Sequence, residues 1–311
     1  MNTTSTAINS ETSAAVRLDN LPISAEFPFE SKYVDVLGSK VHYIDVGEGA
    51  PMVFIHGNPA SSYLWRNVIP HVQDGHRCIA LDLIGMGKSA KPDLDYSYDD
   101  NSAYLAAFID ALDLGDDITL VIHDWGSMLG FRWASENGHR VRGIAFMEAI
   151  VRPLVYADLP GALKVGMKVM RNPFLNWLLV GVANVFLRVM LQDLTLQKLR
   201  PEILAHYRSN HPSVASRKNI RMFPREVPFE GVPARSYNLV TGYIRWIAET
   251  DVPMLLLHGD NGVAIKADEV VWLRDNVTNL DVVDLGHGKH FLQETHPHRI
   301  GTEIARWRAT I

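Results

Sequence analysis

The sequence predicts an α/β protein in which a mostly parallel eight-stranded sheet is flanked by helices and interrupted by an inserted all-helical cap. Two observations carry this prediction. Short apolar runs alternate with stretches whose apolar residues recur at helical spacing, and this alternation is typical of parallel strands with helices on both faces. Between residues 151 and 233 the alternation stops, because only helical stretches broken by prolines occur there.

The individual elements follow from the same patterns. Before the insertion, apolar runs predict strands over 32–37, 40–46, 52–55, 77–83, 118–123 and 141–147. Helical spacing predicts helices over 62–72, 102–112 and 127–135. After the insertion we expect helices over 236–248 and 267–275, strands over 254–258 and 280–284, and a last helix beginning near Pro297.

Three regions follow from this division. Residues 1–20 are rich in Ser, Thr and Ala and are expected to form a disordered tail. Residues 21–150 and 234–311 together complete one α/β core, and residues 151–233 form the helical cap. The tail shows no basic segment followed by an apolar one, so we expect a cytoplasmic protein without a secretory signal.

Composition narrows the function classes. The 311 residues are 47% hydrophobic and 21% charged, which suits a globular enzyme, and the net charge of −5 argues against a nucleic-acid partner. The one cysteine, Cys78, allows no disulfide within the chain. The apolar run 174–191 contains Asn176, Asn184 and Arg188, whereas a membrane span needs about 20 apolar residues. We therefore expect no membrane partner, and the run is instead a candidate homo-oligomer interface.

The run His123-Asp124-Trp125-Gly126 lies between a predicted strand and a predicted helix. This is the layout of the nucleophile elbow, the tight turn of α/β-hydrolases that holds one side chain above the sheet. Most such enzymes carry Ser at the central position, where this chain has Asp124. A carboxylate can attack an alkyl carbon, displace a leaving group and become an ester. On its own, an Asp at this point is more often a helix N-cap.

Two loops strengthen the catalytic interpretation. The turn His56-Gly57-Asn58-Pro59 directly follows a predicted strand, where backbone N–H groups form the oxyanion hole of this fold. The alternative is an ordinary strand-ending turn. The loop 286–291 follows the last strand and contains His287 and His290. We favour His290 as the base because a helix start at Pro297 follows it, and we expect His287 to face solvent.

The acid that orients the histidine is not in its usual place. That place, about four residues beyond the strand 254–258, is occupied by Gly262. Asp260 comes two residues early and is expected only to support the turn. Glu148 ends the strand before the insertion and can reach the same imidazole from a neighbouring strand. The alternative for Glu148 is a structural carboxylate.

Taken together, these motifs resemble those of the haloalkane dehalogenases. The matching segments are HGNPASSYLWR at 56–66, HDWG at 123–126, FME at 146–148 and GKHFLQE at 288–294. The resemblance covers nearly the whole chain after the tail and is closest to subfamily II, whose acid follows the sixth strand. It implies an α/β-hydrolase fold with Asp124 as nucleophile, His290 as base and Glu148 as acid, and Asn58 and Trp125 as the pair that holds the halide. It also implies a small apolar halogenated substrate, a halide product, and no metal or organic cofactor.

The chemistry agrees with the implied halide site. A halide leaving group gains negative charge as its bond to carbon breaks, and it needs hydrogen-bond donors in a dry pocket. The Trp125 indole N–H is a donor only, and the Asn58 amide supplies a second donor. A large apolar cap can exclude water and accept an alkyl chain.

Several cap and loop residues are candidates for the pocket lining. From the cap we expect Met167, Phe186, Met190 and Leu194. The last three are four residues apart and share one helical face if the helix continues that far; the alternative is plain core packing. Val263 and Ala264 match family positions that border the pocket, and the small Ala264 predicts a comparatively open entrance.

Three other features are set aside. The segment 85–89, Gly-Met-Gly-Lys-Ser, resembles the end of a phosphate-binding loop, but Asp82 stands where that motif requires Gly. Ser127 follows the elbow and is expected to cap or pack. Two pairs of histidines near the C-terminus lack a Cys or carboxylate at ligand spacing, so no metal is expected.

The nearest rival is an epoxide hydrolase, which shares the fold and the Asp nucleophile and uses two cap tyrosines to protonate the epoxide oxygen. The cap has Tyr156 and Tyr207, so tyrosines alone do not exclude it. Asn58, Glu148 and Gly262 favour the dehalogenase. A non-catalytic ligand-binding protein on this fold is expected to lack a triad member, whereas all three are present here.

Overall fold

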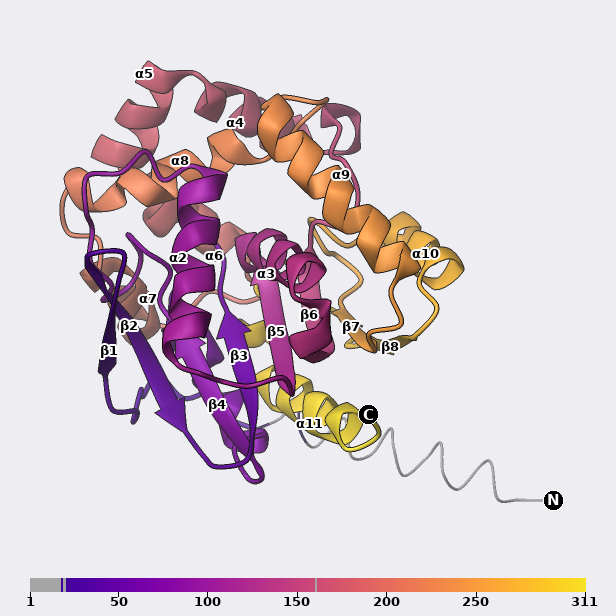
Figure 1. Cartoon of the computed structure of the whole chain (residues 1–311). Coiled ribbons are helices and arrows are strands. Elements are labelled where there is room, and N and C mark those ends of the chain that lie inside the picture. Colours follow the sequence, from indigo (N-terminus) through magenta and orange to yellow (C-terminus); the bar gives the residue numbers. More distant parts are fainter. Residues whose placement is uncertain (1–17, 19–20, 160) are drawn as a thin grey trace.

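The structure is a computed structural model that describes residues 18, 21–159 and 161–311. Eight strands form one sheet in the order β1-β2-β4-β3-β5-β6-β7-β8 (Figure 1). Only the β1–β2 and β2–β4 pairs are antiparallel, which confirms the mostly parallel eight-stranded sheet. The strands are β1 (Lys32–Val36), β2 (Ser39–Val46), β3 (Ala50–Ile55), β4 (His76–Leu81), β5 (Ile118–Asp124), β6 (Val141–Ala149), β7 (Met254–His258) and β8 (Leu280–Asp284). The expected disordered tail, residues 1–20, lies outside the described residues except for Leu18.

Helices cover both faces of this sheet. The helices of the core are α2 (Tyr98–Ala111), α3 (Trp125–Glu136), α9 (Ala234–Glu249), α10 (Ala267–Asn276) and α11 (Pro297–Arg308). On β5, Ile122 packs under Gly130 of α3, whereas Thr119 accepts a hydrogen bond from Arg308 of α11. Residues three apart on a strand point to opposite faces, so α3 and α11 lie on opposite sides of the sheet. Helices α2 and α9 pack beside α3 (Figure 1).

The expected helix over 62–72 is wrong. The segment forms two short 3-10 turns instead, η1 (Ser62–Trp65) and η2 (Ile69–His71). Pro70 has no backbone N–H and disfavours a helical conformation for the residue before it. The Ser62 backbone N–H also donates to the Asp82 carboxylate at 2.7 Å, which ties the start of the segment to the end of β4.

Helix α2 begins earlier than expected because of a cap that the apolar pattern does not reveal. Ser97 Oγ accepts from the Asp100 backbone N–H at 3.1 Å, and the Asp100 carboxylate accepts from the Ser97 backbone N–H at 3.0 Å. This reciprocal capping box satisfies two of the N–H groups that a helix start leaves unpaired.

Between β6 and α9 the chain forms the cap, whose helices α4, α5 and α8 lie at the top of Figure 1. Its helices are α4 (Gly161–Arg171), α5 (Pro173–Asn176), η5 (Trp177–Val182), η6 (Phe186–Met190), α6 (Leu191–Asp193), α7 (Pro201–Ser209) and α8 (Lys218–Glu226). The described residues of this segment contain no strand, only isolated bridges that join Phe229 to Leu154 and to Val232. The turns of η5 and η6 are π-helical.

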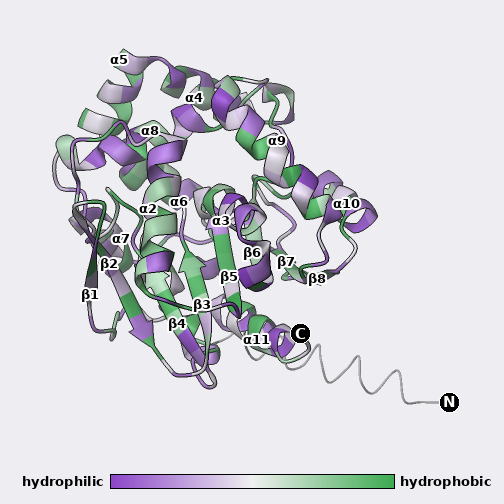
Figure 2. Cartoon of the chain, in the orientation of Figure 1, coloured by the Kyte–Doolittle hydropathy of each residue, from purple (hydrophilic) through white to green (hydrophobic). Residues whose placement is uncertain are grey.

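The hydrophobic core centres on the middle strands, which are mostly coloured as hydrophobic in Figure 2. Strand β5 is buried along its length up to Asp124, and the side chains of β3 from Met52 to Ile55 are fully buried. Burial on both faces explains why these strands are continuous apolar runs. The polar residues that follow them therefore emerge at one edge of the sheet, where the parallel strands end.

Candidate active site

Asp124 is the last residue of β5 and adopts a strained turn. Its backbone has φ 49° and ψ −122°, a region that non-glycine residues rarely occupy. Its side chain makes no helix-capping hydrogen bond, so the N-cap alternative does not describe it. Instead, its Oδ2 accepts from the Asn58 backbone N–H at 2.8 Å. The turn thus holds the carboxylate above the sheet, where it does not cap the N-terminus of α3.

Two glycines allow this close approach. A Cβ on Gly57 would lie 2.3 Å from Asp124 Oδ2, and a Cβ on Gly126 would lie 2.2 Å from the Ile55 carbonyl oxygen. Any side chain at either position would push the elbow away from the turn after β3. Ser127, which was expected to cap or pack, donates through Oγ to the Asp124 carbonyl at 2.5 Å and accepts from the Ile150 backbone N–H.

His290 lies between two carboxylates. Its Nδ1 is 2.9 Å from Glu148 Oε2, and its Nε2 is 3.6 Å from Asp124 Oδ1. The first distance is a hydrogen bond, whereas the second leaves Nε2 facing the carboxylate without a direct bond. His290 is 6% exposed and Glu148 is fully buried. The structure therefore brings together the three residues that the sequence singled out.

Glu148 is held by its surroundings. Besides His290, its carboxylate accepts from the backbone N–H groups of Val263 at 2.7 Å, Ala264 at 3.0 Å and Ile265 at 3.3 Å. Burial alone would raise its pKa, but the hydrogen bonds from His290 and this loop keep the pKa below its usual value. Glu148 is therefore an ionised carboxylate whose position is fixed by the loop after β7.

The pKa of His290 is shifted in the opposite direction. Burial lowers the pKa of an imidazole, but the hydrogen bond to Glu148 and the charges of Asp124 and Glu148 outweigh burial and raise the pKa of His290 above 6.5. The neighbouring His123 shows the contrast: burial, and then the nearby His290, lower the pKa of His123 to about 4. His123 stays neutral and its ring nitrogen Nε2 is 2.9 Å from the His290 carbonyl oxygen, which fixes the backbone of the histidine loop.

A cavity opens directly above these residues. Asp124, His290, Asn58 and Trp125 form its polar end. Its volume is about 130 Å³, which is small for a ligand site and fits a molecule of a few heavy atoms. All six predicted lining residues border it: Met167, Phe186, Met190, Leu194, Val263 and Ala264. Seven further lining residues, all apolar, are not predicted by the sequence patterns: Ile150, Leu154, Leu159, Leu163, Pro224, Val227 and Phe229.

The two expected halide donors, Trp125 and Asn58, lie at the polar end of this cavity and are held in place by different contacts. The Trp125 indole is 2% exposed and stacks on Phe223 with ring centroids 4.3 Å apart, which fixes its plane. The indole borders the cavity, and its Nε1–H can act only as a donor. The Asn58 amide nitrogen donates to the Ile220 carbonyl of the cap at 3.2 Å, and its second N–H stays available.

Comparison with known proteins decides the family. Residues 50–297 match the model of the alpha/beta hydrolase fold family. A haloalkane dehalogenase of Sphingobium indicum is 40% identical over 288 residues, which cover 89% of this chain and 95% of the relative. One from Agrobacterium fabrum is 36% identical, covering 89% of this chain and 91% of that protein. The chain belongs to the haloalkane dehalogenase family.

Solved structures agree with this assignment. The crystal structure of haloalkane dehalogenase DbeA from Bradyrhizobium elkani superposes with a TM-score of 0.88 at 36% identity, covering 91% of this chain and 98% of that one. DatA from Agrobacterium tumefaciens C58 also gives 0.88, at 35% identity, covering 93% and 99% of the two chains. The α/β-hydrolase fold expected from the sequence is therefore confirmed.

Within this dehalogenase, the position of the acid has a steric cause. A Cβ on Gly262 would lie 2.3 Å from Glu148 Oε1 and 2.1 Å from the Ile265 carbonyl oxygen. An acid at position 262 would thus occupy the space that the Glu148 carboxylate fills. Asp260 Oδ2 instead lies 3.0 Å from His287 Nδ1, and both side chains are exposed. This agrees with the expectation that Asp260 supports the turn and that His287 faces solvent.

The Gly-Met-Gly-Lys-Ser turn of the dehalogenase wraps around a carboxylate. Asp82 Oδ2 accepts from the Lys88 backbone N–H at 2.7 Å, and the Asp82 carbonyl accepts from Ser89 Oγ at 2.6 Å. A Cβ on Gly87 would lie 2.1 Å from the same carboxylate. The loop therefore surrounds a negative charge of its own, which is incompatible with holding a phosphate.

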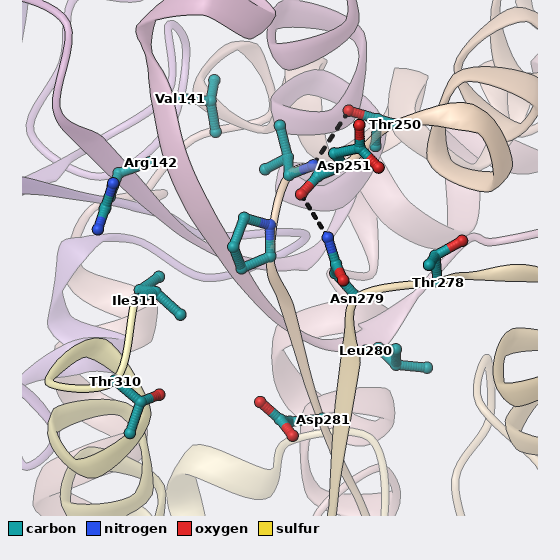
Figure 3. A pocket seen from close by; sticks show the side chains of 12 residues that line it. Val141, Arg142, Thr250, Asp251, Thr278, Asn279, Leu280, Asp281, Thr310 and Ile311 are labelled. Atoms are coloured by element: carbon teal, nitrogen blue, oxygen red, sulfur yellow. Dashed lines mark hydrogen bonds between the residues drawn. The ribbon is translucent and has the colours of Figure 1, made fainter.

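A second hollow lies at the opposite end of the sheet. It has a volume of about 800 Å³ and is lined by residues such as Arg142, Thr250 and Asp281, which flank the starts of β6, β7 and β8 (Figure 3). Asn279 Nδ2 donates there to the Asp251 carbonyl at 2.7 Å. Ligands of parallel sheets bind at the carboxyl ends of the strands, so this hollow is a surface depression away from the chemistry.

No single described helix is long and apolar enough to cross a membrane. One bent pair, Pro173–Val182 with Phe186–Asp193, meets the requirement by length and composition, with a bend of 54° at the break between its two parts. In the described part of the chain, no three His, Cys, Asp or Glu side chains are grouped as metal ligands would be. The cytoplasmic location and the need for no cofactor stay predictions.

Proposed function

We propose that the chain hydrolyses small haloalkanes to an alcohol, a halide ion and a proton. The observation that carries this proposal is the opposed pair at the cavity floor, with the Asp124 carboxylate on the strained elbow and His290 Nε2 3.6 Å away. An apolar cavity bordered by Met167 and Met190 leaves the Trp125 and Asn58 donors as the polar groups for a leaving halide.

In the first step, an Asp124 oxygen attacks the carbon that carries the halogen. The carbon–oxygen bond forms as the carbon–halogen bond breaks, and the halide leaves with the bonding electrons. The N–H groups of Trp125 and Asn58 stabilise the growing negative charge in a site from which water is excluded. The product of this step is an alkyl ester of Asp124.

In the second step, His290 Nε2 takes a proton from a water molecule that attacks the carbonyl carbon of the ester. The Asn58 backbone N–H, which is bonded to Asp124 Oδ2 in the free enzyme, is placed to hold the oxyanion that forms. Glu148 stabilises the imidazolium through the 2.9 Å hydrogen bond to Nδ1. When the intermediate collapses, the bond between the carbonyl carbon and the alkoxide oxygen breaks, and the His290 imidazolium returns its proton to that oxygen to give the alcohol. The proton of the regenerated Asp124 carboxyl group then passes to solvent.

Esterification also prepares the base. The free Asp124 charge raises the pKa of His290, and that charge disappears once Asp124 is an ester. The pKa of His290 therefore falls in the intermediate, so that the imidazole is neutral at the moment when it must accept a proton.

The same contacts support placement in subfamily II, because Glu148 at the end of β6 occupies the position of the acid. They also weigh against an epoxide hydrolase. Tyr207 donates to the buried Glu294 carboxylate at 2.6 Å, and Tyr156 stacks on Phe229. No described tyrosine borders the cavity, so the proton donors for an epoxide oxygen are missing from it.

The deciding experiment follows the oxygen atom. The enzyme in excess over a short bromoalkane, in ¹⁸O-labelled water, should release an alcohol with unlabelled oxygen and leave ¹⁸O on Asp124, because water attacks the ester carbonyl. An Asp124→Ala variant should release no bromide. Labelled alcohol from the first turnover would show direct displacement of bromide by water and would refute the ester intermediate. Diol formation from an epoxide, without bromide release from the bromoalkane, would refute haloalkane hydrolysis as the function.

A further inference from the structure

The cap and the rest of the chain carry opposite net charge. Residues 151–233 contain 12 Lys and Arg but five Asp and Glu, a net charge of +7. The remaining residues carry a net charge of −12. Such an asymmetry within a chain of overall charge −5 is typical of a surface that binds a negatively charged partner.

Most of these cap cations have no counter-ion. Only Arg152, Arg200 and Lys218 form ion pairs with described carboxylates, which leaves nine without one. Some lie close enough to repel one another: burial and then Arg225 lower the pKa of Arg221. Burial and then Arg188 likewise lower the pKa of Arg217. Like charges held together without a described carboxylate as counter-ion favour an external anion.

Apolar side chains are exposed beside these cations. On α5 and η5, Phe174 is 65% exposed and Trp177 42%, while Asn176 and Val180 are buried on the other side of the same helical segment. Leu178 and Val182 extend the exposed side. Phe174, Trp177, Leu178 and Val182 together are called the cap patch below. Helix α5, which carries Phe174, lies at the top of the molecule in Figure 1.

Cations and apolar groups share one surface. The Phe174 and Trp177 ring centroids are 6.2 Å apart. A Cβ on Gly181 would lie 3.6 Å from Trp177 Cδ1 and 3.2 Å from Arg221 Cδ, so the indole and the arginine flank the same glycine. An exposed apolar strip with arginines along it is the pattern of a helix that lies in a membrane interface.

We propose that the cap patch, with Arg221 beside it and Arg188 of η6 near Arg217 at the Gly181 carbonyl, docks this protein on the surface of an anionic lipid bilayer. The helices lie on the membrane and do not span it, because Phe186, Leu187 and Leu191 of the bent pair are buried within the protein. Trp and Phe are suited to the headgroup region, and each nearby arginine adds attraction to anionic lipid. This proposal replaces our expectation of no membrane partner, which considered only a spanning helix.

Two other occupants fit less well. A symmetric dimer through this face would bring two caps of net charge +7 together, which is unfavourable. A nucleic acid would use the arginines, but exposed Leu178 and Val182 offer nothing to phosphates or sugars. The proposal does not depend on the reaction at Asp124, and its test needs no substrate.

The test is co-sedimentation of the full chain with vesicles. Vesicles of phosphatidylglycerol mixed with phosphatidylcholine should bind the protein, vesicles of phosphatidylcholine alone should bind it weakly, and added salt should release it. The Phe174→Ser/Trp177→Ser variant should lower the partition coefficient about tenfold. The Arg188→Gln/Arg221→Gln variant should lower it about tenfold on anionic vesicles.

Matched changes on the core provide the controls. Tyr33→Ser/Val271→Ser removes comparably exposed apolar groups, and Lys40→Gln/Arg274→Gln removes two cations. Both should bind vesicles as the unchanged protein does, and all variants should keep their unfolding temperature. The proposal is overturned if the unchanged protein ignores anionic vesicles, or if core and cap variants lose binding equally. A dimer that dissociates in the cap variants, or binding to duplex DNA alone, would also overturn it.

Discussion

The floor and the roof of the cavity are constructed differently. The floor residues Asp124, Glu148 and His290 are fixed by directional hydrogen bonds, with Glu148 alone accepting four. The roof residues of the cap, such as Met167 and Met190, are partly buried hydrophobic side chains packed against the core cluster. The contrast teaches that bond-making chemistry depends on positions fixed within tenths of an ångström, whereas selecting an apolar substrate depends on volume and water exclusion.

The two layers also share a polar link. Arg66 of the core forms a two-point ion pair with Glu294 at 2.7 and 2.8 Å, and Tyr207 of the cap helix α7 donates to the same carboxylate. All three side chains are buried. Because every member is paired, this network helps to orient the cap over the core. Leaving one of these buried polar groups unpaired would lower the free energy of unfolding.

Removing the base should have the largest effect. His290→Ala leaves Asp124 free to attack but removes the proton acceptor for hydrolysis, so turnover should fall by roughly 10⁴-fold or more. Mass spectrometry after exposure to a bromoalkane should find the alkyl group on Asp124. The Asp124→Ala variant should carry none, and an unmodified Asp124 in His290→Ala would contradict the two-step order.

Neutralising the acid should have the next largest effect. Glu148→Gln keeps the shape but removes the charge that stabilises the imidazolium, so kcat should fall by roughly 10²–10⁴-fold. The pKa of His290 should fall as well, because Glu148 is a main cause of its rise. NMR titration of His290 measures the pKa, with Asp260→Asn on the exposed His287 pair as the control. An unchanged pKa would mean that Glu148 is only structural.

The pH dependence should differ between the two states of the enzyme. Since the pKa of His290 is raised in the free enzyme, its imidazole becomes charged, and unable to act as a base, as the pH falls through a value above 6.5. In the ester the Asp124 charge is gone, so hydrolysis should persist to a lower pH than the free-enzyme titration indicates. Single-turnover rates of ester hydrolysis across pH check this. Coincident midpoints would show that the Asp124 charge has no influence.

A change at the rim should have a moderate effect on selectivity. Ala264→Phe places a ring beside a cavity of about 130 Å³, so kcat/KM for longer bromoalkanes should fall about tenfold relative to short ones. Val271→Phe, on the exposed side of α10, provides the comparison. An unaltered chain-length profile in Ala264→Phe would dismiss the predicted open entrance.

The smallest effect is expected at the polar link. Tyr207→Phe removes one donor to Glu294 while Arg66 keeps its pair, so the free energy of unfolding should fall by about 1–2 kcal/mol. Urea unfolding measures this change, and Tyr33→Phe on the exposed surface should alter it little. A Tyr207→Phe protein of unchanged stability would show that the hydrogen bond to Glu294 does not help to hold the cap on the core.

The sequence by itself determined the order of strands and helices and the nucleophile position. Apolar periodicity reports burial directly, and the elbow depends on neighbouring residues from His123 to Gly126, so local order contains the information. Local order likewise predicted that Ser127 caps or packs and that the turn around Asp82 is not a phosphate-binding loop. The prediction of a helix over 62–72 was wrong because it considered only the apolar spacing. It did not weigh Pro70, and the hydrogen bond from Ser62 to Asp82 is not visible in the sequence.

Only the tertiary structure decided how distant residues meet. Glu148 and His290 are 142 positions apart, and no local pattern reveals that β6 and the last loop bring them to 2.9 Å. The steric exclusion between Gly262 and the Glu148 carboxylate likewise exists only once β7 lies beside β6. The cavity-lining residues of the cap depended most on the tertiary structure, because apolar side chains have the same spacing in the sequence whether they face a cavity or a neighbouring helix. Packing alone distinguishes the two.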